Sequence, residues 1–126
     1  MRIAFIGGGN MAEAIIGGLI KARAADPANI SVGEPIQERA DHLREAYGVQ
    51  TTNNNREAAQ KAVIVVLAVK PQDLPTACDD IRGGLGAEQT VLSIVAGATL
   101  NTLLRLLDHR SVVRVMPNAP AQVGYG

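Results

Sequence analysis

A run of three glycines follows the first short apolar segment of the chain and is the strongest chemical signal in the sequence. Gly7-Gly8-Gly9-Asn10-Met11-Ala12 comes directly after Ile3–Ile6 and matches the pattern G-x-G-x-x-G/A. In this pattern Gly7 permits a tight turn, Gly9 lets the backbone approach a pyrophosphate, and Ala12 keeps the following helix close to the strand. The free N–H groups and the positive dipole end of that helix hold phosphate charge. The sequence therefore predicts a dinucleotide site here.

An acidic residue stands where such a site needs one. Glu34 follows the apolar segment Ile30–Val32 and Gly33, roughly 20 residues beyond the glycine turn, where a carboxylate hydrogen-bonds the adenosine ribose. Two other interpretations stay open at this point. Because Pro35 starts the next helix, Glu34 is also placed to act as a negative charge at that helix start, or to lie in solvent as a loop carboxylate.

Two further strand ends reach the same crevice, because ligands of open α/β sheets lie beyond the carboxyl ends of the strands. Lys70 is the charge that ends the apolar run 62–69, and it is expected beside cofactor or substrate, the alternative being a lysine that only ends a strand. Ala96 and Gly97 offer small side chains against which a ribose or nicotinamide can lie. Asn118 follows the last predicted strand and would reach the same rim, where its side chain can both donate to and accept from a carboxamide.

The usual acid–base groups are expected to be uninvolved. His42 and His109 sit among charged residues and are predicted to be solvated, and Cys78 falls on an apolar helix stripe. Asp79 and Asp80 are predicted to form a solvated turn, since no histidine or second carboxylate pair keeps metal-ligand spacing with them. Reduction of a protonated C=N bond needs mainly hydride delivery, whereas an alcohol dehydrogenase needs a base or a metal, so this pattern favours the former.

Short β-branched runs alternate with segments of helical period, which predicts an α/β fold: a Rossmann-like, doubly wound parallel sheet in the order 3-2-1-4-5-6, with helices on both faces. Inner helix faces are expected at Met11, Ile15 and Leu19; at Leu43, Ala46 and Tyr47; at Leu74, Cys78 and Ile81; and at Leu100, Leu103, Leu104 and Leu107. Asn54 with Glu57, and Thr99, are predicted helix caps, and Pro71 is predicted to begin a helix. The predicted strands are Arg2–Ile6, Ile30–Val32, Val49–Thr51, Val63–Val69 (mid-sheet and buried on both faces), Val91–Ile94 and Val112–Met116.

Composition excludes several classes of protein. The chain has 126 residues, a single cysteine, and 12 basic residues balancing 12 acidic ones. One cysteine forms no disulfide within the chain, and zero net charge with three aromatic rings argues against nucleic-acid or membrane-surface partners. No apolar stretch approaches a membrane span, and glycines interrupt the N-terminal apolar run where an export signal would continue, so a cytoplasmic protein is expected.

Four motifs in order resemble a known family. The segments are Ile6–Leu19, Ala68-Val69-Lys70-Pro71, Ser93–Thr99 and Arg114–Pro120, and together they are similar to the N-terminal half of the pyrroline-5-carboxylate reductases. The resemblance covers essentially the whole chain and implies NAD(P)H as cofactor and the imine 1-pyrroline-5-carboxylate as small-molecule substrate, reduced to L-proline. It places residue 34 at the adenosine ribose, Asn55 near the adenine, and Val69 to Pro71 with Ala96 and Gly97 at the nicotinamide. No catalytic residue is assigned. The expected cofactor contacts are Ile6, Gly7, Gly8, Gly9, Asn10, Met11, Glu34, Asn55, Ala68, Val69, Lys70, Pro71, Ala96, Gly97 and Asn118.

Two departures from the family qualify this expectation. Family members often carry Ser or Asn with a nearby Arg where this chain has Gly33-Glu34-Pro35, and a carboxylate there favours NADH over NADPH. The family's second, helical domain, which forms the oligomer and much of the imine pocket, has no counterpart in residues 1–126, so these are expected to be one truncated dinucleotide-binding domain with little activity alone. The alternatives are another Rossmann oxidoreductase, such as a β-hydroxyacid dehydrogenase or a cofactor-to-cofactor hydride transferase, and a dinucleotide-binding module without turnover.

Overall fold

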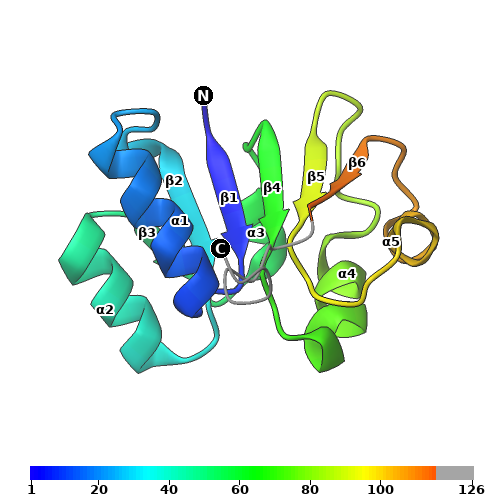
Figure 1. Cartoon of the computed structure of the whole chain (residues 1–126), viewed down its shortest axis with the longest axis horizontal. Helices are drawn as coiled ribbons and strands as arrows, with labels where there is room; N and C mark the ends of the chain where they lie inside the picture. The colour runs from blue at the N-terminus through cyan, green and yellow to red at the C-terminus, as the bar shows by residue number, and fades with distance from the viewer. Residues whose placement is uncertain (116–126) are drawn as a thin grey trace, which may run out of the picture.

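The computed structural model describes residues 1–115, which form one parallel β-sheet between helices (Figure 1). Strands and helices alternate along the chain, as the sequence predicts. The strands are β1 (Ile3–Ile6), β2 (Ile30–Gly33), β3 (Gln50–Thr52), β4 (Ile64–Leu67), β5 (Thr90–Ser93) and β6 (Val112–Arg114). The helices are α1 (Asn10–Lys21), α2 (Gln37–Tyr47), α3 (Asn55–Ala59), α4 (Leu74–Ile81) and α5 (Leu100–Leu107), with short 3-10 turns at η1 (Pro27–Asn29) and η2 (Pro71–Asp73).

The strand order is β3-β2-β1-β4-β5-β6, which confirms the predicted topology. All neighbouring strands pair in parallel, so their carboxyl ends share one edge of the sheet, the lower edge in Figure 1. The register aligns these ends: Ile6 pairs with Gly33 on one side and with Leu67 on the other. The loops that leave β1, β2 and β4 therefore start side by side.

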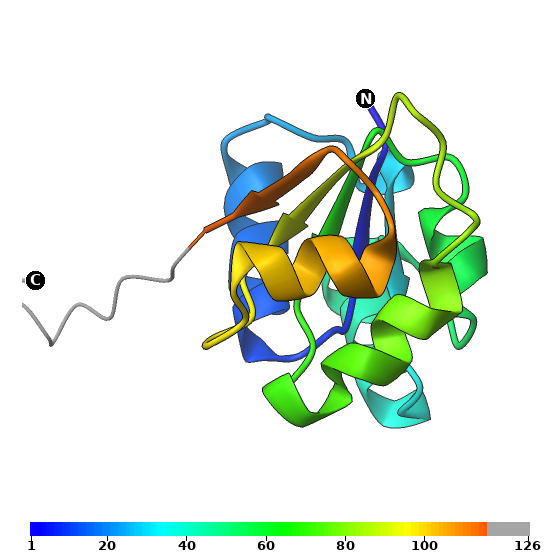
Figure 2. The same cartoon turned by 90° about the vertical axis from the view of Figure 1, so that its right-hand side faces the viewer.

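Helices cover the two faces of the sheet unequally. α1 and α2 pack on one face over β1 to β3, while α3, α4 and α5 pack on the opposite face; Figure 2 shows the sheet between these two layers. On the first face, no helix of residues 1–115 covers β5 and β6, as Figure 1 shows. The side chains there are apolar and partly exposed, among them Val113 at 47% and Val115 at 42%.

All six strands differ from the predicted bounds by one or two residues at an end, because side-chain pattern and backbone pairing do not end at the same residue. β4 is shorter than Val63–Val69, and Val63 is 45% exposed, although its N–H still donates to Arg2 O at 2.8 Å. Strand β3 begins and ends one residue later than predicted. Strand β6 ends at Arg114, and Met116, the predicted strand end, lies outside the described residues.

The buried residues of α1, α2 and α5 differ from the predicted inner faces of these helices. In α1 the buried residues are Ala12 and Ile16, whereas Met11 is 50% exposed, because a helix packed this close to the sheet turns its smallest side chain inward. In α2 Ala46 is exposed, and Ala40 takes its place beside Leu43.

In α5 only Leu103 and Leu107 are buried, and Leu100 is 43% exposed.

The helix starts are largely as predicted. Asn54 Oδ1 accepts the N–H of Glu57 at 3.0 Å, and Thr99 Oγ1 accepts the N–H of Thr102 at 3.2 Å, so both residues cap their helices. Pro71 begins η2, and the α-helix follows from Leu74. None of the helices within residues 1–115 is long and apolar enough to cross a bilayer.

Candidate dinucleotide site at the carboxyl edge of the sheet

The glycine turn joins β1 to α1 at the centre of the carboxyl edge, and Gly7 makes the turn possible. Gly7 has φ +101°, a region that side chains disfavour, and its N–H donates to Gly33 O at 2.8 Å. A Cβ on Gly7 would lie 2.7 Å from the carbonyl oxygen of Ala68 and 3.1 Å from Val69 Cγ1. The turn is thus seated between the ends of β2 and β4, and Ala68 and Val69 lie directly beside it.

Gly9 is different, because nothing stands next to it. It occupies the N-cap position of α1 in an extended conformation, and a Cβ built there would have no atom within 4 Å. No side chain caps this helix, so the N–H groups of its first turn, at Asn10 and Met11, are free of a capping partner. The space ahead of the helix suits an anionic group held by backbone N–H groups and the helix dipole.

Glu34 lies at the end of β2 and is buried, with 8% of its surface exposed. Its Oε1 accepts the N–H of Gly8 and its Oε2 accepts the N–H of Ile36, each at 2.9 Å. The solvated-carboxylate interpretation is therefore wrong. Ile36 is the N-cap residue of α2, so the contact also fits the interpretation of a negative charge at that helix start.

Asn55 and Ile6, two further expected cofactor contacts, lie at the same edge of the sheet but differ in how deeply they are buried. Asn55 begins α3 beside Gly33, where an added Cβ would collide with Asn55 Oδ1, and Asn55 Nδ2 donates to Asp80 Oδ2 at 3.0 Å. Ile6 has no exposed surface. Its side chain is therefore not accessible to a cofactor, and its carbonyl oxygen already accepts the N–H of Ala68.

The strand ends expected at the nicotinamide are open to solvent. Lys70 and Pro71 are exposed after β4, as are Ala96 and Gly97 after β5. Gly97 has φ +78°, and a Cβ there would meet nothing within 4 Å. Asn118, the remaining predicted contact, lies outside the described residues.

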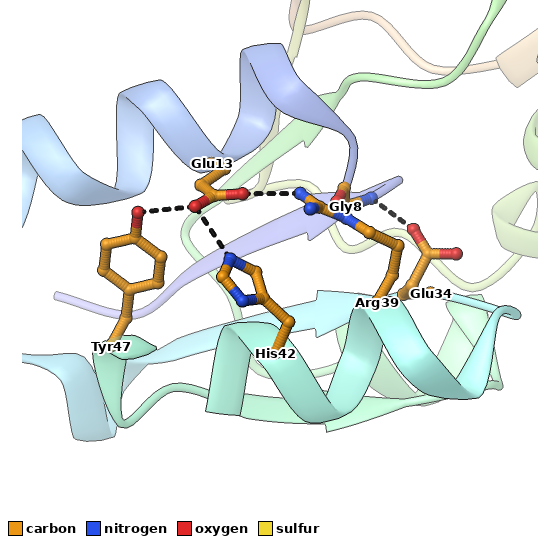
Figure 3. A network of polar contacts seen from close by, with 6 residues as sticks. All are labelled: Gly8, Glu13, Glu34, Arg39, His42 and Tyr47. Atoms are coloured by element: carbon orange, nitrogen blue, oxygen red, sulfur yellow. Dashed lines mark hydrogen bonds and ion pairs between the residues drawn. The ribbon is translucent and has the colours of Figure 1, made fainter. Parts of the chain in front are cut away.

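A polar network between α1 and α2 supports the turn and was not predicted from the sequence. Glu13 Oε1 receives Arg39 Nη2 at 2.7 Å, and Glu13 Oε2 receives Tyr47 Oη at 2.7 Å with His42 Nε2 at 2.9 Å (Figure 3). The same Arg39 donates through Nε to the carbonyl oxygen of Gly8 at 2.9 Å. The sequence does carry a signal for this contact, because Glu13 and Arg39 each lie near the start of a helix that follows one of two paired strands.

The network sets the charge state of Glu13. Hydrogen bonds from His42, Tyr47 and Arg39 lower the pKa of Glu13 from 4.5 to about 2. The hydrogen bond to this carboxylate raises the pKa of Tyr47 in turn. Glu13 is therefore ionised wherever the protein is near neutral pH, and it keeps Arg39 paired.

The two histidines, Cys78 and Asp79 lie in contact with other protein groups or are buried. His42 is exposed as predicted but is paired with Glu13, and His109 is partly buried with Nε2 2.6 Å from Gln89 O, so the expectation of a solvated His109 is wrong. Cys78 is fully buried, as predicted. The predicted turn at Asp79 and Asp80 is wrong, because both residues lie within α4, where Asp79 pairs with Arg82. Within residues 1–115 no cluster of histidine, cysteine and carboxylate groups is able to hold a metal ion.

The sheet order and the glycine turn define a chain of the Rossmann-like α/β class. The chain belongs to the family described as NADP oxidoreductase, coenzyme F420-dependent, which it matches over residues 2–97. Pyrroline-5-carboxylate reductases of Synechocystis and of Escherichia coli are each 40% identical to it over 126 residues, which are 100% and 99% of this chain.

Solved structures agree with this placement. A pyrroline-5-carboxylate reductase from Coxiella burnetii superimposes with a TM-score of 0.84 over 97% of this chain and 46% of its own, at 40% identity. The Plasmodium falciparum pyrroline carboxylate reductase, solved with NADP bound, has a TM-score of 0.80 over 98% of this chain and 45% of its own, at 26% identity. The chain spans about half the length of the curated relatives it matches, 47% in the two named above.

Proposed function

We propose that this chain is the cofactor-binding half of a pyrroline-5-carboxylate reductase, which binds NAD(P)H at the turn from Gly7 to Met11. The observation that carries the proposal is the contrast between neighbouring glycines. A Cβ on Gly7 or Gly8 would collide with protein atoms at 2.7 Å, whereas one on Gly9 would point into open space at an uncapped helix start. Such a cradle fits a pyrophosphate, and relatives at 40% identity supply the substrate class.

Each group at the edge has a role in this proposal. The N–H groups at the start of α1 bind the pyrophosphate, Glu34 and Asn55 face the adenosine end, and Val69 to Pro71 with Ala96 and Gly97 border the nicotinamide. When bound, the reduced cofactor supplies the hydride that the imine carbon of 1-pyrroline-5-carboxylate accepts. The protein's contribution is orientation, because a reaction of this kind gains most from holding donor and acceptor at near-attack distance. Asn118 is proposed as a carboxamide contact from outside the described residues.

The finer proposal is a preference for NADH over NADPH. An ionised Glu34 within about 4 Å of a 2′-phosphate would repel it by roughly 1 kcal/mol in water and by about 4 kcal/mol at an effective dielectric constant of 20. The nearest arginine on α2, Arg39, is already bound to Glu13 and to Gly8 O. The Plasmodium falciparum relative, at 26% identity, was solved with NADP bound, so the affinities of this chain for both cofactors are the decisive measurement.

Cofactor binding is tested by calorimetry with NADH and NADPH on the purified chain and on Gly9→Val. The valine fills the space at Gly9 without striking protein, so the variant should keep its stability and lose binding at least about tenfold. Gly18→Val is the matched control, because Gly18 is also open in α1 but lies away from the turn. Unchanged binding by Gly9→Val would show that the turn is not the site.

The cofactor preference is tested by the same measurement. The parent should bind NADH about fivefold more tightly than NADPH, and Glu34→Gln should reduce this ratio of affinities. Tighter NADPH binding by the parent would refute it.

The substrate is tested with a chimera in which this chain replaces the matched 126 residues of the Escherichia coli reductase. The chimera should oxidise NADH or NADPH in the presence of pyrroline-5-carboxylate and form proline, and the same chimera with Gly9→Val should not. A folded chimera that binds the cofactor but leaves this imine unreduced would contradict the assignment of substrate.

A further inference from the structure

The peptide groups on either side of Gly8 are held from two directions. Glu34 accepts the N–H of Gly8, and Arg39 Nε donates to the carbonyl oxygen of Gly8, each at 2.9 Å (Figure 3). Leu43 closes the position sterically, since a Cβ on Gly8 would lie 2.7 Å from Leu43 Cδ1. The turn is therefore anchored at Gly8 by three residues of the β2–α2 segment.

Arg39 is itself held in place. Its Nη2 lies 2.7 Å from Glu13 Oε1, and its side chain is 28% exposed, so the guanidinium bridges the glycine turn and the first turn of α1. The guanidinium is planar with donors in fixed directions, which lets one side chain make both contacts at once. A lysine has one flexible ammonium group and does not reproduce this geometry.

The orientation of the Gly8 carbonyl decides where the next N–H group points. In a planar trans peptide the C=O of one residue and the N–H of the next point in opposite directions. Because Arg39 draws the Gly8 carbonyl toward α2, the N–H of Gly9 points away from α2. Gly9 is the residue whose Cβ position opens into free space.

We infer that Arg39 is a positioning residue for the dinucleotide: it aims the Gly9 N–H at the pyrophosphate without touching the ligand, and Glu13 holds Arg39 in the required orientation. This inference rests on the proposed dinucleotide site and goes beyond it, because it assigns a cofactor role to a side chain that is occupied by protein contacts. It predicts an effect on every ligand that carries the pyrophosphate, whether or not a 2′-phosphate is present.

The test measures dissociation constants of NADH, NADPH and adenosine for the parent, Arg39→Met, Arg39→Lys, Glu13→Gln and Arg44→Met. Arg44 is the matched control: it lies on the same helix, is exposed, and contacts Asp41 and Thr51 instead of the turn. We expect Arg39→Met to weaken NADH and NADPH by the same factor, about tenfold, with adenosine unchanged. Arg39→Lys should lose nearly as much, Glu13→Gln about threefold, and Arg44→Met less than twofold.

Three outcomes overturn the inference. Equal NADH affinity in Arg39→Met and the parent would show that Arg39 does not position the turn. A loss confined to NADPH would make Arg39 a direct phosphate ligand, and a parallel loss of adenosine binding would indicate a general defect of the fold. If Arg39→Met does not fold, Arg39→Lys and Glu13→Gln carry the comparison. A parent chain that binds neither dinucleotide would refute the proposed function itself, a result separate from any difference between variants.

Discussion

The carboxylate of Glu34 accepts the N–H of Gly8 at 2.9 Å, which joins the end of β2 to the turn that leaves β1. The two residues come from adjacent strands whose ends pair at Ile6 and Gly33. An acidic residue at this position thus shapes the glycine turn through contacts within the protein itself.

Removing that carboxylate should weaken the fold. Glu34→Ala leaves the buried N–H of Gly8 and the part-buried N–H of Ile36 without their acceptors, which costs about 2 kcal/mol of unfolding free energy. Urea unfolding measures the difference, with Glu45→Ala, an exposed position on the helix that Ile36 caps, as control. Equal stability of the two variants would mean that the Glu34 contacts contribute nothing net.

Acid should destabilise the chain partly through Glu13. Contacts in the folded state hold its pKa near 2, below its ordinary value of 4.5, so the stabilisation is complete above pH 4.5 and is lost as the pH falls toward 2. After allowance for solvent screening, this amounts to roughly 1 kcal/mol. The parent should therefore lose about that much more stability than Glu13→Gln between about pH 5.5 and about pH 2.5. Parallel stability curves for the two proteins in urea would contradict this.

An alanine should destabilise the fold at Gly7 but have little effect on stability at Gly9. At Gly7 the new Cβ meets the Ala68 carbonyl at 2.7 Å with φ at +101°, so Gly7→Ala should cost roughly 3 kcal/mol. At Gly9 the backbone is extended and the space is open, so Gly9→Ala should stay within about 0.5 kcal/mol of the parent. Thermal or urea unfolding of both variants decides the matter, and a large loss in Gly9→Ala would mean that the space beside it is filled.

Cys78 should be nearly inert in the native protein. It has no exposed surface, and burial, with a smaller contribution from the charge of Asp79, raises the pKa of its thiol to about 11. Since the thiolate is the reactive form, labelling by a disulfide reagent near pH 8 should be about 100-fold slower than in denaturant. Native labelling at the denatured rate would place the thiol at the surface.

The turn could be predicted because it depends on a short-range pattern, and the strand order because that turn, together with the alternation of strands and helices, identifies the doubly wound fold. Apolar runs separated by helical segments specify a parallel sheet, and the G-x-G-x-x-A spacing specifies the tight turn and the helix start after β1. The rotation of α1 about its axis was predicted less well: Met11 looked like core, but the close contact with the sheet selects Ala12.

Contacts between side chains far apart in sequence were beyond such patterns. Arg39 reaches Gly8 and Glu13 only because α1 and α2 lie side by side at a particular height, which no local spacing encodes. Gln89 is a similar case: it is buried with its amide donating to Ala59 O and Ala62 O, so a polar residue near a strand start becomes part of the core.

The central place of β1 has a consequence for how the chain assembles during synthesis. Once made, β1 can pair with β2 and then β3 as they emerge, with α1 and α2 covering that half of the sheet. Its other edge stays unpaired until β4, at Ile64–Leu67, has been made. During that interval a fully apolar strand offers free N–H and C=O groups to any neighbouring chain. The nascent protein is therefore exposed to aggregation in the interval between the synthesis of β3 and that of β4.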